Sequence, residues 1–346
     1  MIGSLPPRLL VTGGAGFIGS AFVRRVLDRH PDVAITVLDK LTYAGNRANL
    51  ADVEGDARFT FVHGDIADAN LVDRLAREVD AIVNFAAESH VDRSIEEPDA
   101  FIRTDVYGTF VLLEAARRHE HRRYLQISTD EVYGDVSEGS SGESDVLKPR
   151  SPYSASKSGG DLLVGAYHAT YGVPTLLTRA SNNYGPYQYP EKIIPLFITN
   201  AIDGEPLPLY GDGLQIRDWL HVDDHCDALE LVLGDGQPGE TYNVGGGNEL
   251  TNIELTRAIL ELLDRPMTLV RSVPDRAGHD RRYSVDCSKL RGLGWVPAHT
   301  FTDGLRLTVD WYREREDWWR PLKSGEYREY YRRQYEDRLA AGTALE

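Results

Sequence analysis

Two short stretches of this 346-residue chain carry side chains that can move protons. The first reads S-T-D-E-V-Y-G over 128–134, and the second reads Y-S-A-S-K over 153–157. A tyrosine with a lysine four residues later on one helix face suits the removal of an alcohol proton during oxidation. Asp130 and Glu131 go beyond that need, and such a pair suits an enzyme that also takes a proton from carbon and protonates a departing hydroxyl. The alternative interpretation is a turn cap at Asp130 and a solvated Glu131.

A glycine-rich segment near the N-terminus predicts a dinucleotide site. Gly13, Gly16 and Gly19 follow an apolar run and open a helical pattern, so the backbone can turn tightly and approach a pyrophosphate at a helix N-terminus. Asp39 ends the second predicted strand, 20 residues after Gly19, where a carboxylate binds a ribose diol and repels a 2′-phosphate. The pattern therefore favours NAD over NADP, although the neighbouring Lys40 weakens that preference.

Two further residues bear on the cofactor. Asp65 follows the third predicted strand, and it has two interpretations, a contact with the adenine edge or simple turn chemistry. Tyr153 would need its pKa lowered from near 10 by about 3 units to act as a base at neutral pH. Lys157, one helical turn along, and a positively charged nicotinamide would both act in that direction.

Short apolar runs alternate with helical patterns through the first half of the chain. The runs are 9–12, 35–39, 59–62, 81–85, 124–128 and 175–178. This rhythm is typical of βαβ units, and it predicts an α/β fold with a Rossmann-type doubly wound parallel sheet whose strands are buried on both faces. Thr129, Asp130 and Glu131 then lie at the carboxyl edge of the sheet, where ligands bind in such folds.

The pattern becomes irregular beyond residue 179, which indicates a second, smaller mixed α/β domain for the substrate. We expect residues 1–180 to form the NAD-binding domain, which the chain rejoins at about 220–247. Residues 181–219 and 248–346 then form the substrate domain. The Gly- and Ser-rich segment 135–151 links the two proton-moving stretches, and it is interpreted either as a mobile cover over the site or as a plain surface connection.

The composition limits the possible partners. A formal net charge of −16 argues against a nucleic acid or an anionic membrane surface, since both favour Lys and Arg. Cys226 and Cys287 are too few for a disulfide framework and lack zinc-ligand spacing, so we expect buried thiols and no metal. No signal-peptide pattern and no run near the ~20 apolar residues of a membrane span is present, so we expect a cytoplasmic protein.

Several segments along the chain carry a family resemblance. They are D-K-L-T-Y-A-G-N (39–46), E-S-H-V-D-R-S (88–94), T-D-E (129–131), P-Y-S-A-S-K (152–157), R-A-S-N-N-Y-G-P (179–186), I-R-D-W (216–219) and P-D-R-A-G-H-D (274–280). With them the sequence resembles the nucleotide-sugar branch of the extended short-chain dehydrogenase/reductase family, and within that branch the 4,6-dehydratases of dTDP-glucose.

The resemblance implies a reaction that oxidises and then reduces one sugar. Tyr153 would deprotonate the glucosyl 4-hydroxyl while NAD oxidises C4, with Thr129 hydrogen-bonded to the same oxygen. Glu131 would take the C5 proton as Asp130 protonates the 6-hydroxyl, which leaves as water, and NADH would then reduce C6. The cofactor ends as it began, so the resemblance implies tightly bound NAD that is regenerated in each turnover.

The resemblance also implies three sets of site residues and no metal ligand. The catalytic set is Thr129, Asp130, Glu131, Tyr153 and Lys157. The cofactor-binding set is Gly13, Gly16, Phe17, Ile18, Gly19, Asp39, Lys40, Thr42, Asp65, Ile66, Ala86, Ala87, Ser89, Thr104, Tyr153, Lys157 and Asn182. The substrate-binding set is Ser89, Thr129, Asn182, Lys192, Ile193, Pro208, Tyr210, Arg217, Asn252, Arg276 and His279. Cations in that last set make sense because a diphosphate in an acidic protein needs local positive charge.

The family resemblance further implies a homodimer. The helix after Tyr153 and the helix carrying Val106, Phe110 and Leu113 commonly pair with their copies in a second subunit. Gly159 and Gly160 stand where larger residues are expected, at a cost of ~1 kcal/mol per glycine in helix stability. Such small residues would permit a close approach of the two helix pairs.

Four alternatives stay open at this point. A 4-epimerase would share the glycine loop, Tyr153 and Lys157, but it has no use for the Asp130 and Glu131 pair. A decarboxylase of a nucleotide glucuronate would not need Asp130 and would need further cations to bind the sugar carboxylate. A non-catalytic NAD-binding regulator would not need the intact catalytic set. A dehydratase of UDP-glucose is not separated from one of dTDP-glucose, because a single methyl group is recognised by packing. The deoxysugar pathway served is equally open, since cell-wall polysaccharide and natural-product glycosylation share this first step.

Overall fold

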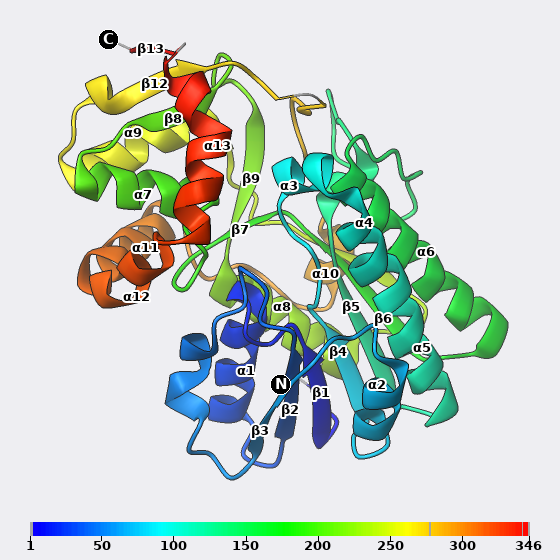
Figure 1. The fold of residues 1–346 in the computed structure, drawn as a ribbon. Helices are drawn as coiled ribbons and strands as arrows, with labels where there is room; N and C mark the ends of the chain where they lie inside the picture. Colours follow the sequence, from blue (N-terminus) through cyan, green and yellow to red (C-terminus); the bar gives the residue numbers. More distant parts are fainter. Residues whose placement is uncertain (1–2, 277, 341, 345–346) are drawn as a thin grey trace.

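A computed structural model describes residues 3–276, 278–340 and 342–344. In these residues the largest sheet has seven parallel strands in the order β10-β6-β5-β4-β1-β2-β3 (Figure 1). Its strands are β1 (Arg8–Thr12), β2 (Ala34–Asp39), β3 (Phe59–His63), β4 (Ala81–Asn84), β5 (Arg123–Thr129), β6 (Thr175–Ala180) and β10 (Thr241–Val244). The order reverses between β1 and β4, as in doubly wound folds, so the predicted fold class is confirmed.

Helices cover both faces of this sheet (Figure 1). One layer holds α1 (Phe17–Arg29) and α8 (Val222–Asp235), and the other holds α2 (Ala69–Ala76), α5 (Thr109–Arg118) and α6 (Pro152–Tyr171). Successive side chains of a strand point to opposite faces. Accordingly Leu9 and Val11 pack in the core with Phe22 of α1, whereas Leu10 packs in the other core with Leu112 of α5.

The prediction that the strands are buried on both faces is wrong for β3. This strand lies at the edge of the sheet, and most of its residues are only partly buried. The central strands β1, β4 and β6 carry almost wholly buried side chains, as expected. The difference arises because an edge strand has a neighbouring strand on one side alone.

The second half of the molecule packs helices around two small sheets (Figure 1). In the described residues these sheets have the orders β11-β9-β7 and β13-β12-β8. Their strands are β7 (Asn182–Tyr184), β8 (Leu207–Tyr210), β9 (Ile216–His221), β11 (Glu249–Thr251), β12 (Val270–Val273) and β13 (Thr343–Ala344). The surrounding helices are α7 (Ile193–Asp203), α9 (Asn252–Leu263), α11 (Phe301–Glu314), α12 (Glu316–Leu322) and α13 (Glu326–Ala340). Aromatic residues such as Phe197, Tyr312 and Trp319 fill this core.

Short elements complete the fold. They are α3 (Val91–Glu96), α4 (Pro98–Phe101), α10 (Ser288–Gly292), the 3-10 turns η1 (Arg47–Val53), η3 (Asp130–Tyr133) and η4 (Met267–Leu269), and the π-helical segment η2 (Ile102–Gly108). Around α10, Leu290 and Trp295 pack in the core of the first half, although the sequence pattern assigns this segment to the second. The chain therefore returns to the first half once more than expected, which adds two crossings between the halves.

The two glycines of α6 serve contacts inside the chain. A Cβ on Gly160 would lie 2.9 Å from the backbone oxygen of Asp105 in η2, and one on Gly159 would lie 3.0 Å from Val106. The small residues therefore let α6 and η2 pack closely within one subunit. Leu113 is fully buried within the subunit, whereas Phe110 on the same helix is 39% exposed.

The segment 135–151 is hydrogen-bonded along the segment 281–286. Val136 N donates to Arg282 O, Ser141 N donates to Ser284 O, and Asp286 N donates to Ser141 O. None of residues 135–151 lines either of the cavities described below. In this structure the segment is a connection held at the surface.

Two sequence expectations concern the rest of the surface and core. Cys226 and Cys287 are free and buried, as predicted. Among the described residues, no helix combines the length and the apolarity that crossing a membrane requires.

Candidate active site

Two adjoining cavities lie at the carboxyl ends of the parallel strands. The larger, of about 310 Å³, is bounded by the segments that follow β1 to β5 and by the start of α6. The smaller, of about 150 Å³, is bounded by α3, β8, β9 and the N-terminal ends of α7 and α9. The residues that line both cavities are Ser89, Glu131, Asn182, Glu191 and Lys192. The two cavities together form one cleft between the halves of the molecule.

The structure brings the predicted site residues together in this cleft. All seventeen residues of the expected cofactor-binding set line the larger cavity, as do all five of the expected catalytic set. Every residue of the expected substrate-binding set lines the smaller cavity, apart from Thr129, which lines the larger one. Ala277, within one of the segments that carry the resemblance, lies outside the described residues.

The glycine-rich turn after β1 leaves no room for a side chain. Gly13 has a φ of +68°, and a Cβ there would lie 2.5 Å from the backbone nitrogen of Ala86. A Cβ on Gly19 would lie 2.4 Å from the backbone oxygen of Gly13. The backbone here can therefore approach a ligand closely at the N-terminus of α1, which fits a dinucleotide pyrophosphate.

The carboxylate of Asp39 is held at the end of β2 by two backbone amides. Leu41 N donates to Oδ1 at 2.8 Å and Ala15 N donates to Oδ2 at 2.9 Å. Burial raises the pKa of Asp39, and these hydrogen bonds oppose that effect. Each oxygen keeps a second lone pair, so the residue fits a ribose diol.

Lys40 and Asp65 form a pair beside Asp39. Lys40 Nζ lies 2.9 Å from Asp65 Oδ2, and Asp65 Oδ1 accepts a hydrogen bond from Ala67 N in a turn. Asp65 therefore does the turn chemistry that the sequence offered as one interpretation, while it also lines the larger cavity. The pairing neutralises part of the positive charge of Lys40.

The proton-moving residues come from the end of β5 and the start of α6. Thr129 ends β5 and caps η3, because its Oγ1 accepts a hydrogen bond from Glu131 N at 3.2 Å. A capping box of Ser151 and Ser154 begins α6 with Pro152 in its first turn. Tyr153 is therefore fixed in the first turn, and Lys157 follows one turn later.

Lys157 is held by the strand beside it. Its Nζ donates to the backbone oxygen of Ile127 at 2.8 Å, and its side chain is buried. Behind it, Asp105 of η2 is also buried, and its carboxylate accepts from Ser156 Oγ at 2.6 Å and from Glu88 N at 3.1 Å. Burial raises the pKa of Asp105 to about 6, and the nearby Lys157 ammonium opposes that rise.

Asp130 and Glu131 differ in their surroundings. Burial raises the pKa of Asp130 well above its ordinary value, and the Glu131 and Asp218 carboxylates raise it further. Burial also raises the pKa of Glu131, but three neighbouring cations oppose that rise, and these are Arg276, Arg217 and Lys192. Asp130 Oδ2 has no hydrogen-bond partner among the described residues. The pair thus favours a protonated Asp130 beside a more acidic Glu131, an acid and a base in one cavity.

The surroundings of Tyr153 differ from the sequence expectation. Burial raises the pKa of its phenol well above the ordinary value, and the Glu131 and Asp105 carboxylates raise it further, whereas a hydrogen bond with Thr129 lowers it. The protein's own groups therefore hold Tyr153 protonated. Deprotonation at neutral pH needs a strong additional positive charge close to the phenol.

Three buried or partly buried cations face the smaller cavity. Arg217 stacks over the ring of Tyr283 at 4.3 Å and donates to the backbone oxygen of Asp280 at 3.0 Å. Lys192 donates to the backbone oxygen of Ser89. Arg276 Nη1 lies 3.3 Å from Asp92 Oδ1. This local positive charge, in a chain of net charge −16, suits an anionic group such as a diphosphate.

Comparison with known proteins identifies the family. The family model described as GDP-mannose 4,6 dehydratase matches residues 10–308. The chain belongs to this family. A dTDP-glucose 4,6-dehydratase of Streptomyces antibioticus is 55% identical over 91% of this chain and 95% of its own length.

Two solved structures place the chain within this group of folds. The dTDP-glucose 4,6-dehydratase DesIV from Streptomyces venezuelae, with NAD and TYD bound, matches 91% of this chain and 100% of its own with a TM-score of 0.90 and 58% identity. The UDP-glucose 4-epimerase of Thermus thermophilus, in complex with NAD, matches 89% of this chain and 99% of its own with a TM-score of 0.83 and 33% identity. The resemblance to the nucleotide-sugar branch is confirmed, and the fold alone does not separate its activities.

Sequence reasoning missed several residues that line the smaller cavity. Asp92 and Glu191 are buried carboxylates of the smaller cavity, and Tyr335 reaches it from α13 near the C-terminus. Asp92 lies inside the resembling segment 88–94 and Glu191 lies next to Lys192, so motif proximity could have found both. No local signal marks Tyr335, because α13 is a mostly polar helix without a clear apolar stripe.

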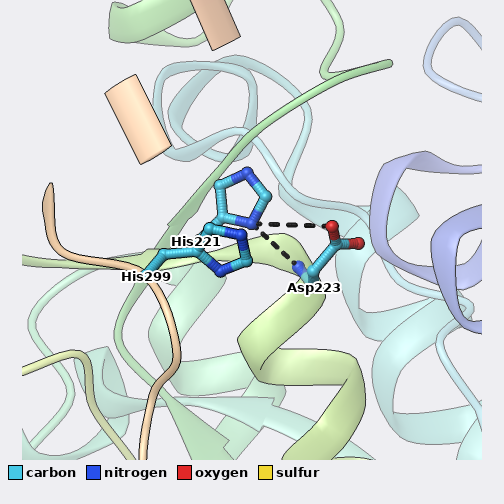
Figure 2. A group of neighbouring side chains, drawn as sticks. All are labelled: His221, Asp223 and His299. Carbon is cyan, nitrogen blue, oxygen red and sulfur yellow. Dashed lines mark hydrogen bonds and ion pairs between the residues drawn. The ribbon is translucent and has the colours of Figure 1, made fainter. Parts of the chain in front are cut away.

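A second group of possible metal ligands lies elsewhere in the molecule. Figure 2 shows His221 and Asp223 at the start of α8, with His299 beneath the His221 ring. The two rings stack with centroids 4.2 Å apart, Asp223 N donates to His221 Nδ1 at 3.3 Å, and Arg25 Nη1 lies 3.3 Å from Asp223 Oδ1. His299 Nδ1 donates to Asp224 Oδ1 at 2.9 Å. The histidine stack and His299 join α8 to the segment around residue 299, and Asp223 pairs with Arg25 of α1, so we assign no metal to this group.

Proposed function

We propose that this chain is a dTDP-glucose 4,6-dehydratase that uses tightly bound NAD and forms dTDP-4-keto-6-deoxyglucose. The observation that carries the proposal is the pair of a buried Asp130 and a partly buried Glu131 in the same cavity as Thr129 and Tyr153. A 4-epimerase has no step for such a pair, whereas the loss of water needs an acid and a base. The names and identities of the similar dehydratases support the same activity.

NAD, when bound, supplies the oxidant for C4 of the sugar and the reductant for C6. We assign its pyrophosphate to the turn at Gly13, Gly16 and Gly19 and its ribose to Asp39. Other contacts come from the rest of the predicted set, which is Phe17, Ile18, Lys40, Thr42, Asp65, Ile66, Ala86, Ala87, Ser89, Thr104, Tyr153, Lys157 and Asn182. The repulsion of a 2′-phosphate by Asp39 favours NAD over NADP.

Tyr153 takes the proton of the 4-hydroxyl in this mechanism. Thr129 hydrogen-bonds the same oxygen, which fits its hydrogen bond with the Tyr153 phenol. Lys157, fixed by Ile127 O, places an ammonium one helical turn from the phenol. Because the protein's own carboxylates disfavour the phenolate, the reaction depends on the positive charge of Lys157 and of the oxidised nicotinamide ring.

Glu131 and Asp130 expel the 6-hydroxyl. Oxidation at C4 acidifies the proton on C5, and Glu131, made more acidic by its cations, removes that proton. Asp130, held protonated by burial, gives its proton to the leaving 6-hydroxyl. The unpartnered Oδ2 of Asp130 is available for that contact.

The smaller cavity holds the nucleotide diphosphate in this proposal. Lys192, Arg217 and Arg276 neutralise the phosphates, and Pro208 and Tyr210 lie near the base. The remaining contacts come from Ser89, Asn182, Ile193, Asn252 and His279. Burial lowers the pKa of His279 to about 4, so we expect this residue to be neutral and to act through hydrogen bonds.

We further propose a homodimer through α5 and α6. Phe110 and Leu162 are exposed large apolar residues on these helices, at 39% and 67%. Apolar side chains exposed together on neighbouring helices favour association. Sedimentation equilibrium at micromolar concentration should give a dimer, and Leu162→Asp should shift it to monomer. The cytoplasmic location stays a prediction.

The activity is tested by comparing dTDP-glucose with UDP-glucose as substrates. We expect turnover of dTDP-glucose to a 4-keto-6-deoxy sugar, with deuterium placed at C4 recovered at C6 of the product. A faster reaction with UDP-glucose would move the assignment to a UDP-glucose dehydratase. Recovery of a galactose or pentose product, or of unchanged sugar, would overturn the dehydratase proposal.

A further inference from the structure

Asn49 is a buried polar residue that touches both halves of the molecule. It lies in η1, close to the glycine-rich turn, and its side chain is 2% exposed. Its Oδ1 accepts a hydrogen bond from Trp318 Nε1 at 2.9 Å, and its Nδ2 donates to the backbone oxygen of Ala15 at 3.0 Å. A buried carboxamide is costly unless both of its ends are paired, so these two bonds are what make Asn49 tolerable at this position.

The Ala15 end of this link is part of the cofactor turn. Ala15 lies between Gly13 and Gly16, is fully buried, and donates its N–H to Asp39 Oδ2 at 2.9 Å. The peptide groups around Ala15 are therefore fixed on one side by the carboxylate assigned to the ribose and on the other by Asn49 and by Asn46 N, which donates to the same Ala15 oxygen at 3.0 Å. Movement of Asn49 would loosen both the glycine-rich turn and the hydrogen bond from Ala15 N that holds Asp39.

The Trp318 end belongs to the second half of the molecule. Trp318 lies in α12 and packs edge-on against Tyr187 and Trp311, with ring centroids 5.6 Å and 5.1 Å apart. Arg24 of α1 lies over one of these aromatic partners, Tyr187, at 4.3 Å. The indole N–H of Trp318 thus comes from a rigid aromatic cluster that rests on α1 and η1.

We propose that Asn49 and Trp318 are positioning residues that clamp the glycine-rich turn to the second half of the molecule, so that NAD is not released between the two redox steps. The inference rests on the proposed function. In that cycle the sugar remains a ketone until C6 is reduced by the same cofactor. Loss of the cofactor before that reduction would leave the oxidised intermediate unable to form product. Release requires local opening of the turn, and a buried hydrogen-bonded clamp makes such opening less favourable.

The test measures how well the purified protein keeps NAD. Trp318→Phe removes the indole donor and leaves Asn49 Oδ1 unpaired, and Asn49→Asp keeps the acceptor for Trp318 but removes the donor to Ala15. Each should raise the dissociation constant for NAD about tenfold or more, the expected scale for one unpaired buried polar group. NAD bound per subunit after gel filtration, and its dissociation rate, are the readouts.

Trp319→Phe is the matched control. Trp319 is the next residue of α12, is fully buried, and donates its indole N–H to Tyr312 O at 2.8 Å, entirely within the second half. It should lower the melting temperature about as much as Trp318→Phe and leave NAD retention unchanged. If NAD retention followed melting temperature across all three variants, or if Trp318→Phe and Asn49→Asp kept NAD as well as Trp319→Phe, the clamp would be refuted. A parent protein that bound no NAD would instead refute the proposed function.

Discussion

The cofactor half and the substrate half of the cleft are built from different kinds of chemical groups. The cofactor half uses backbone groups and a few side chains from successive βα turns, with Gly13 and Asp39 as its centre. The substrate half gathers charged side chains from distant segments, and its pair of Arg276 and Asp92 joins residues 184 positions apart. A local motif can specify the first kind of site. The second exists only when the whole chain has folded.

The comparison teaches where each half is vulnerable. In the cofactor half a single carbon added to Gly13 would contact backbone atoms, and moving the backbone aside costs free energy. In the substrate half the function rests on a balance of charges, because Arg276, Arg217 and Lys192 limit the rise that burial causes in the pKa of Glu131.

The largest effect is expected where the two halves meet. Asp130→Asn combined with Glu131→Gln should still oxidise the sugar, seen as absorbance of NADH, but product formation should fall about a thousandfold because acid and base are both lost. Glu97→Gln with Asp99→Asn, two exposed carboxylates near α4, makes the same charge change and should leave activity intact. Normal dehydration by the first variant would show that the roles are assigned wrongly.

The cofactor half should fail when one methyl group is added to its turn. Gly13→Ala should raise the dissociation constant for NAD about a hundredfold, because the positive φ and the contact with Ala86 both oppose a side chain. Gly172→Ala is the matched control, since Gly172 has a φ of +70° and no atom within 4 Å of its Cβ position. It should lose about 1–2 kcal/mol of stability and bind NAD normally. Equal NAD affinities in the two variants would count against a turn that must touch the cofactor.

The substrate half should bind the nucleotide sugar less tightly, with turnover unchanged, when the hydrogen bond that supports Asp92 is removed. Gln334 of α13 donates to Asp92 Oδ2 at 2.9 Å, and Asp92 in turn pairs with Arg276. Gln334→Leu should raise KM for the nucleotide sugar about tenfold while kcat stays within about twofold, because the lost bond orients a binding group.

Arg333→Gln provides the control for that change. Arg333 is the neighbouring residue of α13, and it forms an exposed ion pair with Glu96 at 3.0 Å. Its loss should change KM less than about twofold. A Gln334→Leu variant with unchanged KM would mean that α13 does not support the nucleotide site.

The same contrast explains what the sequence could predict. The sheet strands and the glycine turn follow from apolar runs and spacings that act within a few residues, and the structure contains them within one or two positions. Gln334 and Tyr335 could not be found this way, because a polar helix shows no pattern that tells which of its residues will face a distant cavity.

Other misses arose from long-range packing. Of the residues named on the helix expected to meet a second subunit, Leu113 packs in the chain's own core, and its sequence position does not reveal this. Leu290 and Trp295 return to the first core through a segment with no strong periodicity. Burial and the Glu131 and Asp105 carboxylates raise the pKa of Tyr153, and sequence spacing does not reveal that Asp105 reaches the site from η2.

The smallest predicted effect concerns that buried carboxylate. Because burial raises the pKa of Asp105 to about 6 from an ordinary value of 3.8, the folded protein binds a proton between these values that the unfolded chain does not. Stability from this group is therefore present at low pH and is lost as pH rises through about 6. Relative to Asp105→Asn, the parent protein should lose about 1 kcal/mol of unfolding free energy between pH 5 and 7.

The measurement is denaturant unfolding of both proteins across that pH range. Lys157 and Glu88, the charged groups that face Asp105, are present in both proteins. Asp99→Asn, which removes an exposed carboxylate on the neighbouring α4, is the control variant. A flat difference for Asp105→Asn would mean that Asp105 stays ionised in the folded protein. The cofactor half would then hold a fully charged carboxylate beside Tyr153, and the positive charge needed to ionise the phenol would be larger still.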